Sequence, residues 1–102
     1  MMYINQNNGT ARVDLLGDLN KSNILPIKED ILQMMRSDIE AVEFNFAKVE
    51  NMDAPAMAII VIVVKQLLNK KISSRVKGLT KECNELANFL GLHMIADVER
   101  EV

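Results

Sequence analysis

The chain has 102 residues, 49% of them hydrophobic, which suffices for one domain spanning residues 1–102 to bury a core without disulfides. A formal net charge of −2 argues against a dedicated nucleic-acid-binding protein, which normally presents a basic face. The single cysteine suits a reducing compartment, and no charged-then-apolar leader precedes the fold, so we expect a cytoplasmic protein. The longest uncharged apolar run, Ala54 to Val64, is too short for a membrane span, which needs about 20 residues.

The first two predicted elements are short strands. Met2 to Gln6 is a candidate strand, and the turn signal Asn7-Asn8-Gly9 follows it. Ala11 to Leu16 reads as a second strand, and we expect Gly17 to end it. Because the connection is so short, the two strands are predicted to form an antiparallel hairpin.

Helices and strands then alternate. Asn23 is a candidate N-cap for a helix whose apolar residues recur at helical spacing: Ile24, Ile27, Ile31 and Met34 or Met35. Val42 to Phe46 alternates as a third strand, and Ile72 to Lys77 is a weaker fourth strand. Thr80 is expected to cap a helix with one apolar stripe, made of Cys83, Leu86, Ala87 and Leu90. His93 to Ala96 is a candidate last short strand.

The segment from Ala54 to Leu68 is open to two interpretations. Its central residues, Ile59 to Val64, have the β-branched content of a buried strand. Its length favours a helix, as do Asp53 at the N-cap position and Pro55 near the first turn. We predict a helix, because strands linked by helices also give a parallel sheet with right-handed crossovers.

This predicted helix is apolar on more than one side. Its inward stripe is expected to be Met57, Ile60, Val61, Val64 and Leu68. The opposite side would carry four more apolar residues: Pro55, Ile59, Ile62 and Val63. Exposed apolar patches of this kind mark interaction surfaces, and this one adjoins Asp53. The alternative is that neighbouring helices cover these side chains.

Catalytic and metal chemistry have little support in the sequence. General acid–base or nucleophilic catalysis needs convergent titratable groups, and the chain has one histidine and one cysteine. Cys83 lies on the inward stripe of its helix and reads as a small core residue. No ligand spacing suggests zinc, and no glycine-rich loop follows a strand. We therefore expect no enzyme, no catalytic residues, no metal and no cofactor.

Three segments, in this order, resemble the STAS domain, the fold of anti-sigma factor antagonists. Val13 to Asn20 resembles the family's apolar strand that ends in Gly-Glu-Leu-Asp, and Asn45 to Asp53 resembles its Asp-Leu-Ser-x-Val-x-Phe-Ile/Met-Asp. Leu86 to Leu92 resembles the closing helix, which commonly ends in Gly-Leu. The resemblance implies an α/β fold: a mixed, mostly parallel β-sheet of about four to five strands packed with about three to four helices.

The resemblance also implies a switch, and this chain departs from it. In the family a kinase phosphorylates a Ser or Thr placed directly after the strand's terminal Asp, which here is Asp53. This chain has Ala54-Pro55-Ala56 there, so Ala54 and Pro55 occupy a degenerate phosphoacceptor position. Asn20 and Asn45 stand where the family has Asp. The expected partner-binding residues are Asn20, Lys21, Ser22, Asp53, Ala54, Pro55, Ile59, Ile62 and Val63. For Asp53, a role as helix cap alone is the simpler alternative.

Three functions remain open from the sequence. The favoured one is a non-enzymatic regulator of the anti-anti-sigma type that binds a kinase-like anti-sigma factor, or a related partner, without phosphorylation at the usual position. The second is an accessory STAS subunit that binds the ATPase of an ABC-type lipid transport system. The third is a small-molecule or nucleotide binder that uses the carboxyl ends of the strands, near Gly17 to Asn20 and Asp53. A homodimer is compatible with each of them.

Overall fold

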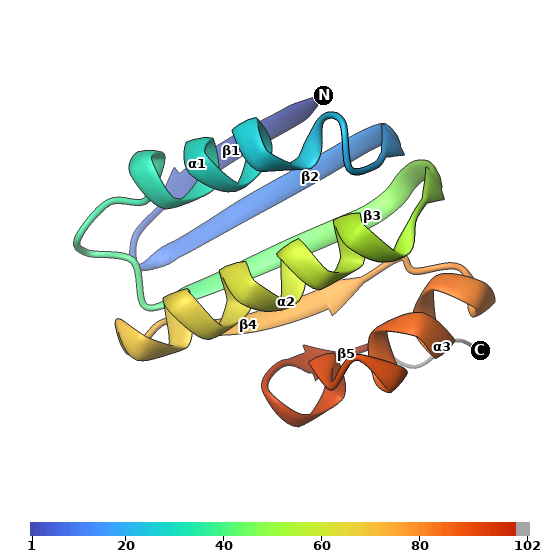
Figure 1. Ribbon diagram of the computed structural model, residues 1–102. Coiled ribbons are helices and arrows are strands. Elements are labelled where there is room, and N and C mark those ends of the chain that lie inside the picture. The colour runs from blue at the N-terminus through green and yellow to red at the C-terminus, as the bar shows by residue number, and fades with distance from the viewer. Residues whose placement is uncertain (100–102) are drawn as a thin grey trace.

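A five-stranded sheet and a layer of helices make up the computed structural model, which describes residues 1–99 (Figure 1). The strands are β1 (Met2–Asn7), β2 (Thr10–Leu19), β3 (Ala41–Met52), β4 (Ser73–Lys77) and β5 (Asp97–Val98). The helices are α1 (Ile24–Met34), α2 (Ala54–Asn69), α3 (Lys81–Phe89) and the short 3₁₀ helix η1 (Leu92–Met94). Within residues 1–99, no helix is both long and apolar enough to cross a membrane.

The sheet is mixed and mostly parallel, as predicted. Its strand order is β1-β2-β3-β4-β5, in which only β1 and β2 pair antiparallel. The helices α1 and α2 connect parallel strands and lie on the same face of the sheet (Figure 1). The helix α2 packs against α1 on one side and α3 on the other, with β4 beneath it. Among the described residues, no helix covers the other face of the sheet (Figure 1).

Strand alternation explains which residues form the core. Val13, Phe44 and Val76 stand side by side on β2, β3 and β4, and all three are buried beneath the helices. Their sequence neighbours point to the uncovered face, since successive side chains of a strand point to opposite sides. The core therefore lies between the sheet and the helices, and the other face is polar.

Both central strands are longer than predicted. β2 continues through Gly17, where φ is +76° and the register with β3 shifts, so this glycine forms an irregularity inside the strand instead of ending it. β3 likewise continues past Phe46 to Met52, which pairs with Leu19. The extension carries the ends of both strands to the loop before α2.

Two helix caps are confirmed and one is wrong. Asp53 accepts a hydrogen bond from the Ala56 N–H (2.9 Å), and Thr80 accepts one from the Cys83 N–H (3.2 Å). Asn23 precedes α1 but makes no side-chain cap bond. The reason is local: the third helical position after it is Pro26, which has no N–H to donate.

The predicted strand from His93 to Ala96 is also wrong. Gly91, at φ +89°, turns the chain after α3, and the buried Leu92 then begins η1. The backbone bond from the Ala96 N–H to the Leu92 carbonyl closes this compact turn. The strand forms only at Asp97–Val98, which pair with Arg75 and Val76 of β4.

Candidate functional site

The structure joins the two loop segments that the sequence placed in the candidate site. Asp53 Oδ2 accepts a hydrogen bond from the backbone N–H of Lys21, 32 residues earlier in the chain, at 3.1 Å. The Asp53 N–H donates to the carbonyl of Leu19, also at 3.1 Å. Because Oδ1 of the same carboxylate caps α2, one side chain holds both the helix start and the loop after β2.

The loop after β2 is further ordered by its own asparagines. Asn20 Oδ1 accepts from the Ser22 N–H at 2.9 Å, and Asn23 Oδ1 accepts from the Asn20 N–H at 2.9 Å. Asn23 Nδ2 donates to the Asp18 carbonyl at 2.8 Å. These short-range bonds fix the loop as an Asx-type turn, with the Lys21 and Ser22 side chains exposed. The asparagine predicted as a helix cap thus serves the loop instead.

The start of α2 carries no hydroxyl group. Ala54 and Pro55 are both exposed, and neither has a side chain that can accept phosphate. The Ala56 N–H already donates to Asp53, and the Met57 N–H donates to the Asp53 carbonyl at 3.2 Å. The positive end of the helix is therefore occupied by the chain's own carboxylate.

The predicted outward side of α2 needs a correction. Val63 is 0% exposed, so its assignment to the outer surface is wrong, whereas Ile62 is 39% exposed and Ile59 is half-buried. Leu68, predicted to face inward, is 45% exposed. Four of the five residues predicted to face inward, Met57, Ile60, Val61 and Val64, are buried, and Ala56, Val63 and Leu67 widen the buried side. Since α2 lies between α1 and α3, a wider arc of it is covered than a helix on a bare sheet would bury.

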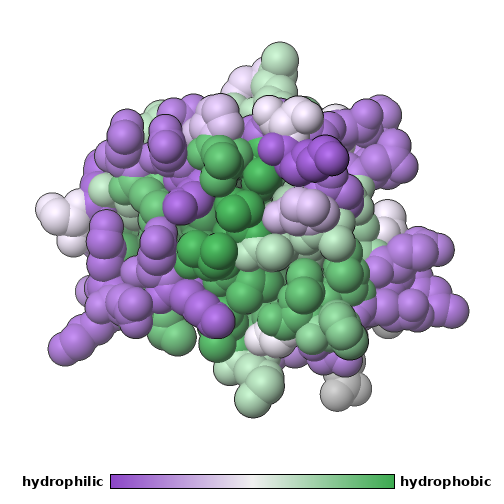
Figure 2. All heavy atoms as spheres, in the orientation of Figure 1, coloured by the Kyte–Doolittle hydropathy of each residue, from purple (hydrophilic) through white to green (hydrophobic). Residues whose placement is uncertain are grey.

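What remains exposed is a smaller apolar area. Figure 2 shows hydrophobic residues gathered over the middle of the helix-covered face, with polar residues around them. The large apolar side chains exposed on the helices are Leu25 and Met34 on α1, Ile62 and Leu68 on α2, Phe89 on α3 and Met94 on η1. Pro55 is exposed at the first turn of α2. The candidate partner-binding surface thus consists of the Asn20–Ser22 loop, Asp53, Ala54, Pro55 and the outward edge of α2 at Ile59 and Ile62.

Reactive side chains do not gather at this surface or elsewhere in the described residues. His93 Nε2 lies 2.9 Å from Asn84 Oδ1, a contact that joins η1 to α3. Cys83 is half-buried and packs against the core, close to the prediction. Within residues 1–99, no three His, Cys, Asp or Glu side chains converge in a way that would hold a metal ion.

These features define a small two-layer α/β domain with a mostly parallel sheet. The family model of the STAS domain matches residues 2–102, and the chain belongs to this family. No curated protein sequence matches the chain.

Solved structures share its fold at low sequence identity. The unphosphorylated anti-sigma factor antagonist SpoIIAA is 13% identical, with 100% of this chain and 90% of that chain covered and a TM-score of 0.73. An anti-sigma factor antagonist from Mycobacterium paratuberculosis is 12% identical, with 100% and 86% covered and a TM-score of 0.77. A serine-to-glutamate variant of RsbS from Moorella thermoacetica is 12% identical, with 99% and 87% covered and a TM-score of 0.79.

Proposed function

We propose that this protein is a non-enzymatic regulatory binding module of the anti-anti-sigma type. Its partner is a kinase-like anti-sigma factor or a related ATPase-fold protein. The support is the STAS fold together with the names of its structural neighbours, two of which are anti-sigma factor antagonists. The partner docks at the Asp53 end of α2 and on the Asn20–Ser22 loop.

The single observation that carries this proposal is the double hydrogen bond of Asp53. Its two carboxylate oxygens bind the N–H groups of Ala56 and Lys21, so helix start and loop form one connected surface. A surface that is ordered before binding loses less conformational entropy when a partner docks. Such an arrangement suits recognition more than catalysis, because it consumes the carboxylate in structural bonds.

Binding at this surface is independent of phosphorylation at the degenerate position. Ala54, Pro55 and Ala56 offer no hydroxyl, and a phosphate is the charge that would otherwise be added at a helix N-terminus. The exposed apolar groups beside it, Pro55 and Ile62, supply contact area that does not depend on charge. The protein then acts constitutively, and its abundance sets the occupancy of the partner.

The test is affinity capture from the native cell, with the captured protein purified and its affinity measured. Wild type is compared with Ile62→Asp and with the matched control Leu68→Asp, which places the same charge at a similarly exposed position nearer the other end of α2. We expect a kinase-like or ATPase-fold partner that binds wild type and Leu68→Asp equally, and Ile62→Asp at least tenfold more weakly. Equal affinity for all three proteins would place the interface elsewhere.

A further inference from the structure

On the uncovered face of the sheet, a row of small side chains lies next to a row of long charged side chains. Thr10, Ala41 and Ser73 stand in one row across β2, β3 and β4. The row two residues further along the strands consists of long charged side chains, which are Arg12, Glu43, Arg75 and Asp97. Small side chains next to long ones leave a depression, and a groove of about 730 Å³ lies here. Binding sites for small molecules have volumes of roughly 300–1,000 Å³.

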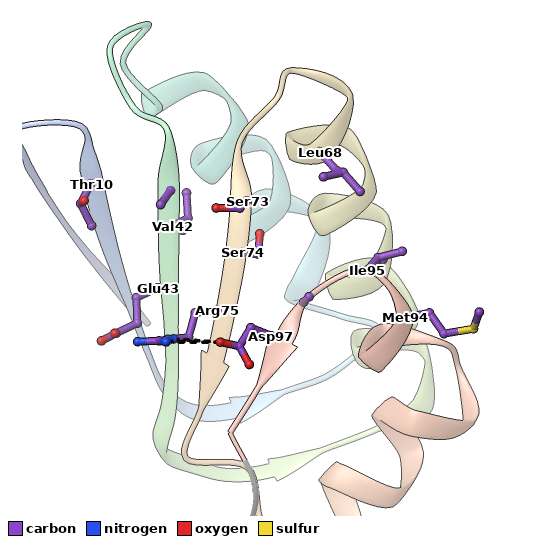
Figure 3. Close-up of a pocket in the computed structure, with 12 residues that line it drawn as sticks. Thr10, Val42, Glu43, Leu68, Ser73, Ser74, Arg75, Met94, Ile95 and Asp97 are labelled. Carbon is purple, nitrogen blue, oxygen red and sulfur yellow. Dashed lines mark hydrogen bonds and ion pairs between the residues drawn. The ribbon is translucent and has the colours of Figure 1, made fainter.

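The groove continues around the edge of β4. β5 pairs only with Arg75 and Val76, so among residues 1–99 the beginning of β4 has no strand on its edge away from β3. Apolar side chains close the groove at this edge. They are Leu68 near the end of α2, Met94 of η1, and Ile95, which directly follows η1. Figure 3 shows Thr10, Glu43 and Ser73 on one side of β4 and the apolar residues Leu68, Met94 and Ile95 on the other.

A buried hydroxyl without a partner lies along the groove. Ser74 lines it, is 6% exposed, and has its side chain on the side of β4 where Leu68 and Ile95 lie (Figure 3). Within the part of the chain that the structure describes, no group forms a hydrogen bond with its Oγ. Leaving such a group unpaired destabilises the fold, which makes an unmatched buried hydroxyl uncommon. Leu68, itself 45% exposed, is free to change rotamer and admit a ligand to it.

The charges along the groove are already compensated. Glu43 Oε1 pairs with Lys77 Nζ at 2.9 Å, and Asp97 Oδ2 pairs with Arg75 at 3.3 Å. A charged ligand would find no spare counter-ion among these four side chains. The groups left for a ligand are the hydroxyls of Thr10, Ser73 and Ser74 and the apolar wall.

We propose that this groove binds a small uncharged amphipathic molecule, an alcohol or amide whose apolar body rests on Leu68 and Ile95 and whose polar group bonds to Ser74. The groove lies at the amino ends of the parallel strands, whereas Asp53 follows the carboxyl end of β3. The ligand site is thus separate from the proposed partner-binding surface, and either can fail without the other.

The test is a titration of the ¹⁵N-labelled full chain with three probes of equal chain length, which are 1-hexanol, hexanoate and hexylammonium. We expect 1-hexanol to shift the amide signals of Ser73, Ser74 and Ile95 with saturation at millimolar concentration. The two charged probes are expected to bind more weakly. No saturable shift with any probe, or preferred binding of a charged probe, would overturn the proposal.

Three variants locate the site. Ser74→Ala removes the hydroxyl and should weaken 1-hexanol binding about threefold to tenfold, the range of one neutral hydrogen bond, while the free protein melts no lower than wild type. Ile95→Ala shortens the apolar wall on which the ligand rests and should weaken binding about threefold or more. Asn5→Ala, which shortens an exposed side chain of β1 outside the groove, should bind as wild type. Unchanged binding in Ile95→Ala would contradict the site.

Discussion

The carboxylate of Asp53 and the backbone N–H of Lys21 are joined by a hydrogen bond of 3.1 Å. The same carboxylate caps α2 through Ala56, so it has a structural role beyond the cap predicted from sequence. Two segments that lie 32 residues apart in the chain thereby share one anchor. This anchor defines the candidate partner-binding surface.

Two substitutions of Asp53 distinguish its role as the cap of α2 from its role as the acceptor for the Lys21 N–H. Asp53→Ala loses both bonds and is expected to lower the free energy of unfolding by about 1–2 kcal/mol. Asp53→Ser keeps a capping oxygen but has no second acceptor, so it should lose about half as much. In both variants the Lys21 amide should exchange with solvent faster than in wild type. Urea denaturation and NMR hydrogen exchange measure these effects, and an unchanged Lys21 exchange rate in Asp53→Ser would refute the anchor.

Neighbouring positions on α2 should respond very differently to a charge. Val63→Asp places a carboxylate in the core and is expected to cost more than about 4 kcal/mol, a large part of the stability of a domain of this size. Ile62→Asp places it on a surface that is 39% exposed and should cost about 1 kcal/mol or less. Thermal unfolding followed by circular dichroism compares the two. Similar melting temperatures would mean that the orientation of α2 is wrong.

Two glycines with positive φ differ in the space around them. A Cβ on Gly78 (φ +81°) would lie 2.5 Å from the Ala47 backbone nitrogen, whereas a Cβ on Gly91 (φ +89°) meets nothing within 4 Å. Both Gly→Ala substitutions should cost about 1 kcal/mol for the left-handed conformation. Gly78→Ala should cost about 1–3 kcal/mol more, because backbone must move to remove the overlap. Equal losses in urea denaturation would contradict the close approach of β3 and the end of β4.

The ion pair between Glu43 and Lys77 predicts a dependence on pH. The Lys77 ammonium, bonded at 2.9 Å, lowers the pKa of Glu43 below its ordinary value of 4.5. A carboxylate with a lowered pKa stabilises the fold above its unfolded pKa, and this contribution is lost as the pH falls through the folded value. Wild type should therefore exceed Glu43→Gln in free energy of unfolding at pH 7, by less than about 1 kcal/mol, and this excess should shrink as the pH falls below 4.5. A difference that stays constant from pH 7 to about pH 3 in urea denaturation would rule out this pair as its source.

Much of the architecture could be predicted from the sequence because its signals are local. The caps Asp53 and Thr80 each bond to a residue three positions later, so sequence spacing alone identifies them. The alternation of Val42, Phe44 and Phe46 likewise determines which side of β3 is buried. The family resemblance implied a mixed, mostly parallel sheet, which the structure confirms.

What could not be predicted depends on contacts between distant segments. The burial of Val63 reflects the position of α2 between α1 and α3, and a nearly all-apolar helix does not indicate how wide an arc of it is covered. The anchoring of Lys21 by Asp53 requires β2 and β3 to end together, which follows from the register irregularity near Gly17. The groove beside Ser74 requires the pairing of β2, β3 and β4. It also requires the last strand to form at Asp97–Val98 and not at the predicted residues 93–96, because β5 then leaves one edge of the start of β4 uncovered.

The most direct test of the proposed function adds a charge at the start of α2, in the position that the resemblance implies for the family's phosphoacceptor. Isothermal titration calorimetry with the purified captured partner compares wild type, Pro55→Glu and Asn69→Glu. The two variants each add one negative charge at opposite ends of α2, on exposed positions. A carboxylate at a helix N-terminus does not destabilise the helix, so Pro55→Glu should remain folded. We predict that Pro55→Glu binds at least tenfold more weakly while Asn69→Glu binds as wild type, and equal affinity of Pro55→Glu and wild type would contradict the proposed docking surface.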